Sequence, residues 1–173
     1  MGLELLNSYM PMLRQYAAME LLCCNEETAA YGLMLTPMQA MELVEVRDRS
    51  LVALGRVELG NGILDKLIHA FCDSPYLSSY NYTETLHELT ECFYEYKNET
   101  LDLMDDDELI SRMKELFDGV CKGSIELLRE RELVRIAENL RFGRPPDEKE
   151  EDDEHDGYDE YDGFETARGY RPE

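Results

Sequence analysis

The stretch TPMQAMELVEVRDRSLVALG, residues 36–55, decides the fold because it shows the start, the buried face and the end of one helix. Thr36 is a preferred N-cap residue, Pro37 suits the first helical position, and Gln39 completes a capping box. Between these residues and Gly55, apolar side chains recur every three or four positions, at Ala40, Leu43, Val44, Leu51 and Leu54. This period predicts an amphipathic helix with one buried face.

The same signals recur on both sides of this helix and predict about six helices. A first helix is expected over 8–31, where Gly32 supplies a left-handed stop. A glycine-bounded loop, 55–62, is followed by helices over 63–73 and 83–103, then by one capped by Asp105 and one capped by Ser124. Because no run of β-branched residues alternates with polar ones, the sequence predicts an all-α, compact bundle.

Three details of this bundle are specific expectations. In the helix over 8–31, the predicted core positions are Leu13, Tyr16, Ala17, Leu21 and Cys24. In the fifth helix, Val120 is predicted to share the core face. In the sixth helix, Arg129 and Glu132 fall within the apolar arc, and their spacing of three residues predicts an ion pair at a helix–helix contact. The alternative is a charged contact in a groove or at an oligomer interface.

Composition divides the chain into a helical domain, 1–142, and an acidic tail, 143–173. The tail carries 13 of the 39 acidic side chains but only 4 of the 17 basic ones. It opens with Gly143, Arg144 and two prolines, which end a helix, and it has no aliphatic residue between Pro146 and Phe164. Such a segment has too little apolar surface to offset the entropy of ordering, so we expect it to be disordered.

Charge and cysteine content narrow the functional classes. A net charge of −22 excludes a large basic face, so we expect neither nucleic acid nor an anionic membrane as partner, but another protein. Five irregularly spaced cysteines without a C-x-x-C motif predict free thiols. The sequence contains neither a secretory signal nor an apolar run long enough to span a bilayer. Together with the free thiols, this predicts a cytoplasmic location.

Several stretches resemble an uncharacterised family of short proteins, mostly from anaerobic Firmicutes, known only as a domain of unknown function. They are NEETAAYGLMLT, GRVELGNGILDKLIHAFCDSPY, YTETLHELTECFYEYKNETLD, DDELISRMKELFDG and GSIELLRERELVRIAENLRFG. The resemblance covers most of the predicted bundle and implies a bacterial origin. It implies no activity, cofactor or catalytic residue, and the acidic tail lies beyond it.

Five side chains are candidate metal ligands. Asp65, His69 and Cys72 occupy positions i, i+4 and i+7 of one predicted helix, and their chemistry suits zinc. Glu84 and His87 form one Glu-x-x-His element of the kind found in di-iron bundles. The alternative for each group is an ordinary surface pair, because two turns of one helix seldom converge on one ion and no second Glu-x-x-His is present. We expect no resident cofactor.

Three functions remain open from the sequence. The first is a helical protein–protein interaction module, with the methionine-rich helices over 8–31 and 36–55 as its surface, unless those methionines fill the core. The second is a metal-binding protein or metal-dependent enzyme built on His69, Cys72 and His87. The third is an acidic mimic of nucleic acid. No arrangement of residues identifies a catalytic group or the oligomeric state, and we favour the first function.

Overall fold

The computed structural model describes residues 2–58 and 60–149, with side chains from Ser8 onward, and within these residues it contains helices and turns but no strand. The all-α prediction is confirmed. The longer helices are α1 (Gly2–Cys23), α3 (Pro37–Ala53), α4 (Leu64–Phe71), α5 (Tyr82–Glu99), α6 (Asp106–Asp118) and α8 (Leu133–Arg141). The shorter segments are α2 (Asn25–Thr28), η1 (Ala29–Tyr31), α7 (Ile125–Leu127) and η2 (Leu128–Glu132).

Three helix starts, those of α3, α6 and α7, follow the predicted caps. The Thr36 hydroxyl accepts a hydrogen bond from the Gln39 backbone N–H at 3.2 Å, and the Gln39 side chain accepts one from the Thr36 N–H at 2.9 Å. Asp105 and Ser124 also accept from the backbone three residues on. These bonds satisfy donors that a helix terminus leaves free, so local sequence sets where the helices begin.

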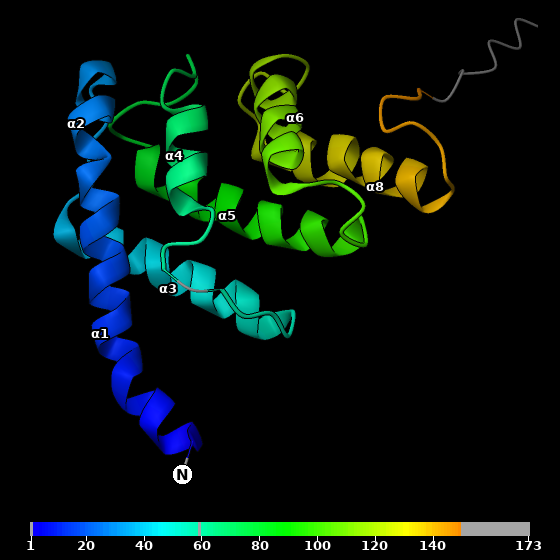
Figure 1. The fold of residues 1–173 in the computed structure, drawn as a ribbon. Helices are drawn as coiled ribbons and strands as arrows, with labels where there is room; N and C mark the ends of the chain where they lie inside the picture. Colours follow the sequence, from blue (N-terminus) through cyan, green and yellow to red (C-terminus); the bar gives the residue numbers. More distant parts are fainter. Residues whose placement is uncertain (1, 59, 150–173) are drawn as a thin grey trace, which may run out of the picture.

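Helix α5 is the central element of the fold, since it packs against α3, α4, α6 and α8 (Figure 1). One apolar cluster lies among α4, α5, α6 and α8, where the rings of Phe71 and Phe117 meet edge to face at 5.5 Å. A second cluster, around Leu21 and Val44, lies where α1 and α3 meet α4 and the start of α5. Each fully buried side chain of this size stabilises the fold by roughly 1.5–3 kcal/mol.

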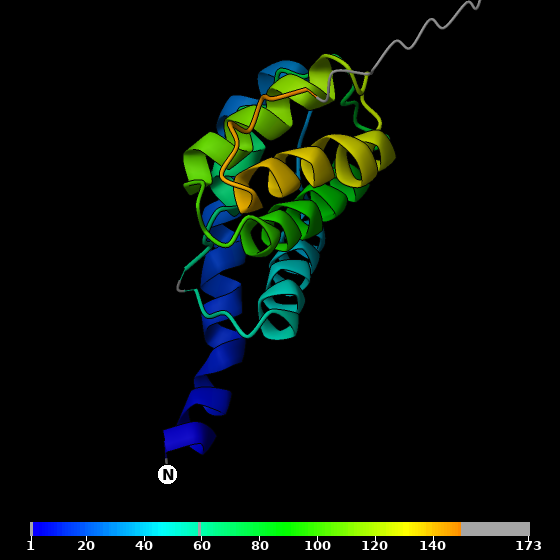
Figure 2. The same ribbon diagram turned by 90° about the vertical axis from the view of Figure 1, so that its right-hand side faces the viewer.

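Helix α1 is packed over only part of its length. Ala17, Leu21 and Cys24 are buried against the rest of the protein, as predicted. The N-terminal half of α1 projects past α3 and away from the other helices (Figures 1 and 2). The prediction that Leu13 and Tyr16 belong to the core is wrong, because both are exposed on the side of α1 that does not face α3.

The last helix is interrupted by a π-helical turn, η2, which the sequence analysis did not predict. A π turn contains more residues than an α turn, and here Leu128 and Leu133 are both buried although they are five residues apart. The predicted ion pair between Arg129 and Glu132 is wrong, because the wider turn directs them to different partners. Arg129 binds Glu95 of α5 at 2.6 Å, and Glu132 binds the neighbouring Arg131 and Arg135.

Two further expectations need correction. Val120 is exposed rather than buried, because α6 ends at Asp118 and the chain turns there. The fourth predicted helix ends at Glu99 instead of residue 103, since Leu101 and Asp102 have positive φ angles of 55° and 56° that no α-helix accommodates.

The start of the acidic segment, residues 143–149, is described and packs on α8. The side-chain amide of Asn139 donates to the carbonyl oxygens of Glu148 at 2.8 Å and Pro146 at 3.3 Å. Arg135 also donates to the Glu148 carbonyl, at 3.1 Å. The expected disorder of the tail therefore does not extend to these residues, and the rest of the predicted tail lies outside the described residues. In the described chain, no helix is both long and apolar enough to cross a membrane.

Candidate protein-interaction surface

A stripe of large side chains runs along the outer face of α1. Tyr9, Met12, Tyr16 and Met19 have exposed fractions of 55%, 56%, 64% and 64%, and Cys23 is exposed at the end of the same row. The intervals are three, four, three and four residues, which keeps all five side chains on one side of a helix. We call these five residues the α1 stripe.

The α1 stripe faces away from the protein because the opposite face of the helix is anchored. Ala17 and Leu21, on that opposite face, pack with the buried side chains of α3. Pro11 lies inside α1 but off the stripe, and because it lacks a backbone donor it favours a bend of the helix between Tyr9 and Met12. The sequence therefore gives α1 two apolar faces, one of which is covered.

A buried cluster of charges holds α1 on α3. The Arg14 guanidinium donates to Asp48 at 2.7 Å, and Arg47 donates to the other carboxylate oxygen of Asp48 at 2.9 and 3.0 Å. Arg47 is only 4% exposed and also donates to the carbonyl oxygen of Gly60. Because each charge has a partner, the cluster tolerates burial and fixes the direction in which α1 leaves the bundle.

The methionines divide between the core and the surface. Met104 and Met113 are buried and fill the larger apolar cluster. The exposed ones lie in α1, at the start of α3 and in the turn before it, and they are Met10, Met12, Met19, Met34 and Met38. Met41 packs against the second apolar cluster, but core filling does not account for the other methionines of the first two predicted helices. Flexible thioether side chains beside exposed tyrosines are typical of surfaces that bind other proteins.

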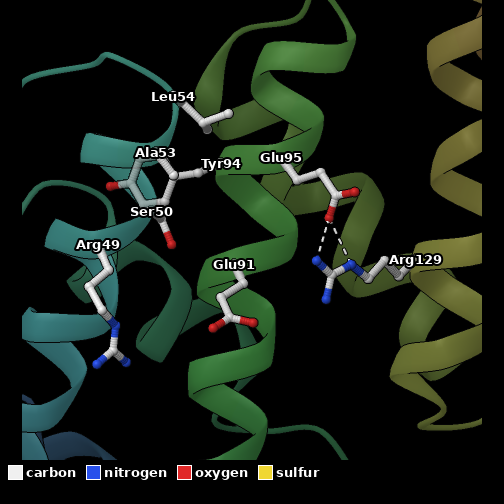
Figure 3. A pocket seen from close by; sticks show the side chains of 8 residues that line it. All are labelled: Arg49, Ser50, Ala53, Leu54, Glu91, Tyr94, Glu95 and Arg129. Carbon is white, nitrogen blue, oxygen red and sulfur yellow. Dashed lines mark hydrogen bonds and ion pairs between the residues drawn. The ribbon is translucent and has the colours of Figure 1, made fainter.

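A groove of about 340 Å³ lies between α3, α5 and η2, and Figure 3 shows its lining side chains. Arg49 lies on the α3 wall, and Glu91 and Glu95 come from α5. Arg129 closes one side by donating to Glu95 at 2.6 and 2.7 Å. The lining offers an ion pair and the apolar side chains of Ala53 and Leu54, and it contains neither histidine nor cysteine.

The candidate metal ligands do not form a common site. His69 Nδ1 lies 3.1 Å from a carboxylate oxygen of Glu27, and the Cys72 thiol donates to the His69 carbonyl. Asp65 accepts from the N–H of the next residue. His69 and Cys72 both line a second hollow on the surface. Glu84 and His87 lie on α5, and neither of them lines this second hollow. Among the described residues, no three histidine, cysteine, aspartate or glutamate side chains are placed to hold a metal ion.

The thiols are also poor nucleophiles. Burial raises the pKa of Cys92 to about 12, and burial likewise raises the pKa of Cys24, Cys72 and Cys121 above its ordinary value. A thiol reacts as its thiolate, so the raised pKa lowers the reactive fraction of these four side chains near neutral pH. Cys23 is the exposed thiol, and it lies on the α1 stripe.

Sequence reasoning missed the α1 stripe, although the signal was present. Tyr9, Met12, Tyr16 and Met19 repeat with a period of 3.5 residues, separate from the row formed by Ala17, Leu21 and Cys24. Assigning Leu13 and Tyr16 to the core merged these two rows into one face. Two separate apolar rows on one helix indicate two packing partners, and only one of them is present in the described fold.

A model of a family of unknown function, DUF6323, matches residues 20–146. The match begins after most of the α1 stripe and ends close to the start of the acidic segment. No curated protein matches the chain. No solved structure matches it either.

Proposed function

We propose, starting from the fact that this chain belongs to the DUF6323 family, that it is a helical protein–protein interaction module that binds through α1. One observation carries the proposal: the α1 stripe presents four large apolar or aromatic side chains, each more than half exposed, on a helix that projects from the fold. A monomeric protein seldom leaves a continuous row of this kind in water unless the row binds something.

The chemistry of the stripe supports a protein as the partner. Tyrosine and methionine provide large contact area, and neither carries a charge near neutral pH. The remaining candidate functions have less support. The candidate ligands for a metal are dispersed, and the idea of an acidic mimic rests on net charge alone. Because the family match does not include residues 9–19, the proposal concerns this chain rather than the family.

The proposal extends to origin, location and the tail. We take the chain to be a bacterial, cytoplasmic protein of the Firmicutes, which the resemblance of its sequence and its five free thiols support. The acidic segment after residue 149, with a high density of carboxylates, would tune solubility and the choice of partner. No catalytic step is part of this function.

Site-specific photo-crosslinking in the native host tests the proposal. A photoreactive phenylalanine analogue in place of Tyr16 should give a discrete protein adduct, because this side chain lies in the middle of the α1 stripe. The same analogue in place of Tyr80, which is almost fully exposed but lies outside α1, is the matched control and should give none.

Specificity is tested by adding Met12→Glu to the Tyr16 probe. A carboxylate in the row should abolish the adduct, since burying an unpaired charge against an apolar partner is unfavourable. If the Tyr16 probe gives no adduct, or one that Met12→Glu does not reduce, the α1 stripe is not a binding face and the proposed function is wrong.

A further inference from the structure

We infer that the partner of the α1 stripe is the α1 stripe of a second copy of this chain, with the two helices antiparallel. The inference rests on the proposed function, because both place the binding face on α1. It adds the identity of the partner, the direction of pairing and the residues that meet.

The spacing of the stripe is self-complementary. In an antiparallel pair centred on residue 14, Tyr9 of each copy lies opposite Met19 of the other, and Met12 lies opposite Tyr16. Every tyrosine ring then faces a thioether, which is a favourable contact worth roughly 0.3–1.5 kcal/mol. In a parallel pair, each side chain would instead lie opposite its own equivalent. Intervals of three and four residues are those of a two-helix seam, where side chains of one helix fit between those of the other.

Charge favours a second copy at this face and opposes one elsewhere. The chain has a net charge of −22, so two copies repel one another over most of their surfaces. The five positions of the α1 stripe carry no acidic side chain, and the exposed Glu20 is the acidic residue at the edge of this row, so repulsion between two copies is weakest here. The other helices of the protein gather at the C-terminal end of α1 (Figure 1). Antiparallel pairing therefore places the acidic helical domains of the two copies at opposite ends of the paired helices. Parallel pairing would place them side by side.

The length of the projecting helix gives the pair enough surface. A helix of 22 residues is about 33 Å long. From their exposed fractions, the side chains of the stripe and the adjacent Leu13 offer on the order of 600 Å² per copy, so about 1,200 Å² in a pair, the lower limit for a specific interface. A reversible dimer with a micromolar dissociation constant fits an interface of this size better than a permanent one.

Sedimentation velocity of the purified full-length chain over a range of concentrations tests the pairing. The native chain should shift from monomer to dimer as its concentration rises. Met12→Glu together with Met19→Glu should raise the dissociation constant at least tenfold. Met38→Glu is the matched control, because it adds the same charge at an exposed methionine outside the stripe and should leave the dimer unchanged. Circular dichroism checks that each variant stays helical.

Disulfide trapping tests the direction of pairing. With Cys23→Ser as background, the double variant Tyr9→Cys, Met19→Cys should form a covalent dimer on mild oxidation, because antiparallel pairing brings positions 9 and 19 together. The single variant Tyr9→Cys should stay monomeric. Covalent dimers of the single variant would show parallel pairing and overturn the inference.

Two other outcomes also overturn it, and they separate the inference from the proposed function. A chain that stays monomeric at all concentrations, yet gives a Tyr16 adduct with a different protein, disproves self-pairing and leaves the interaction module standing. A chain whose dimer survives both glutamate substitutions pairs through another surface. Absence of any Tyr16 adduct contradicts the proposed function itself.

Discussion

At the scale of single residues, burial of tyrosine hydroxyls couples folding to alkaline pH. Tyr82 is buried at the start of α5, and burial raises its pKa from 10 to about 12. Burial raises the pKa of Tyr96 to about 12 as well. Because the pKa of the hydroxyl is higher in the folded than in the unfolded protein, the free energy of unfolding is highest below pH 10 and falls as the pH rises toward 12.

Replacing one of these two tyrosines by phenylalanine should make the free energy of unfolding depend less steeply on alkaline pH. The free energy of unfolding of the native protein should fall by about 1.4 kcal/mol per pH unit for each such tyrosine. Tyr82→Phe should remove one such contribution, as measured by urea unfolding at several alkaline pH values. Tyr80→Phe is the control, since Tyr80 is almost fully exposed. Equal slopes for both variants would show that Tyr82 ionises without unfolding.

The charge cluster under α1 gives a second prediction at this scale. Asp48→Ala removes the carboxylate that Arg14 and Arg47 share, and it leaves a buried guanidinium without its main partner. We expect a loss of about 3–5 kcal/mol in the free energy of unfolding. Glu45→Ala, at an exposed position of the same helix, should cost less than about 0.5 kcal/mol. A small loss in Asp48→Ala would mean that water compensates the arginines.

At the scale of helices, the π turn is the feature with the clearest consequence. Five residues of π helix bring Leu128 and Leu133 to the same side, a result that four residues of α-helix also give. Deleting the exposed Glu130 should therefore convert η2 into an α turn and preserve both contacts. The stability should change by less than about 2 kcal/mol in thermal unfolding followed by circular dichroism.

A deletion in a regular helix is the control for this prediction. Removing the exposed Glu115 from α6 rotates the residues after it by about 100°, so Phe117 leaves its contact with Phe71. This variant should lose more than about 3 kcal/mol. If both deletions are equally damaging, the π turn has a role beyond the spacing of its two leucines.

How much of the fold could be predicted also differs between helices. The starts of α3, α6 and α7 follow from Thr36, Asp105 and Ser124, because a cap depends only on residues within one turn. The exposure of Leu13 and Tyr16 could not be predicted in this way. Whether an apolar row is covered depends on which face of the helix a distant helix packs against, and α3 packs against the face of α1 that carries Ala17 and Leu21.

The candidate site shows the same division between local and distant causes. The α1 stripe is visible in the spacing of Tyr9, Met12, Tyr16 and Met19, but only the fold shows that nothing in the described chain covers it. The partners of Arg129 and Glu132 were not predictable, because a π turn has no strong sequence signature. The metal hypothesis came from spacing on single helices, and spacing alone does not place His87 near His69.

At the scale of the whole molecule, the packed part of the chain continues past residue 142, because the backbone of Pro146 and Glu148 accepts hydrogen bonds from α8. A chain that ends at Lys149 keeps the acceptors for Asn139 and should match the full-length protein within about 2 °C in its thermal midpoint. A chain that ends at Phe142 leaves the buried amide of Asn139 without those acceptors and should lose about 1–3 kcal/mol.

Differential scanning calorimetry of the two truncated chains measures this difference at equal ionic strength. The segment after residue 149 carries 11 acidic and 2 basic side chains, so its removal changes the charge of the protein. The segment 143–149 carries no net charge, so its further removal changes the hydrogen bonds and leaves the net charge the same. If the chain ending at Lys149 is also destabilised, residues after it contribute contacts to the fold.

The α1 stripe also has an optical consequence. The protein contains no tryptophan and 11 tyrosines, so its ultraviolet emission comes from tyrosine alone. In most proteins tryptophan accepts the excitation energy of nearby tyrosines and hides their signal. Tyr9 and Tyr16 are two of these 11 tyrosines, so the summed tyrosine emission and its anisotropy should change when the α1 stripe is covered, without any attached dye.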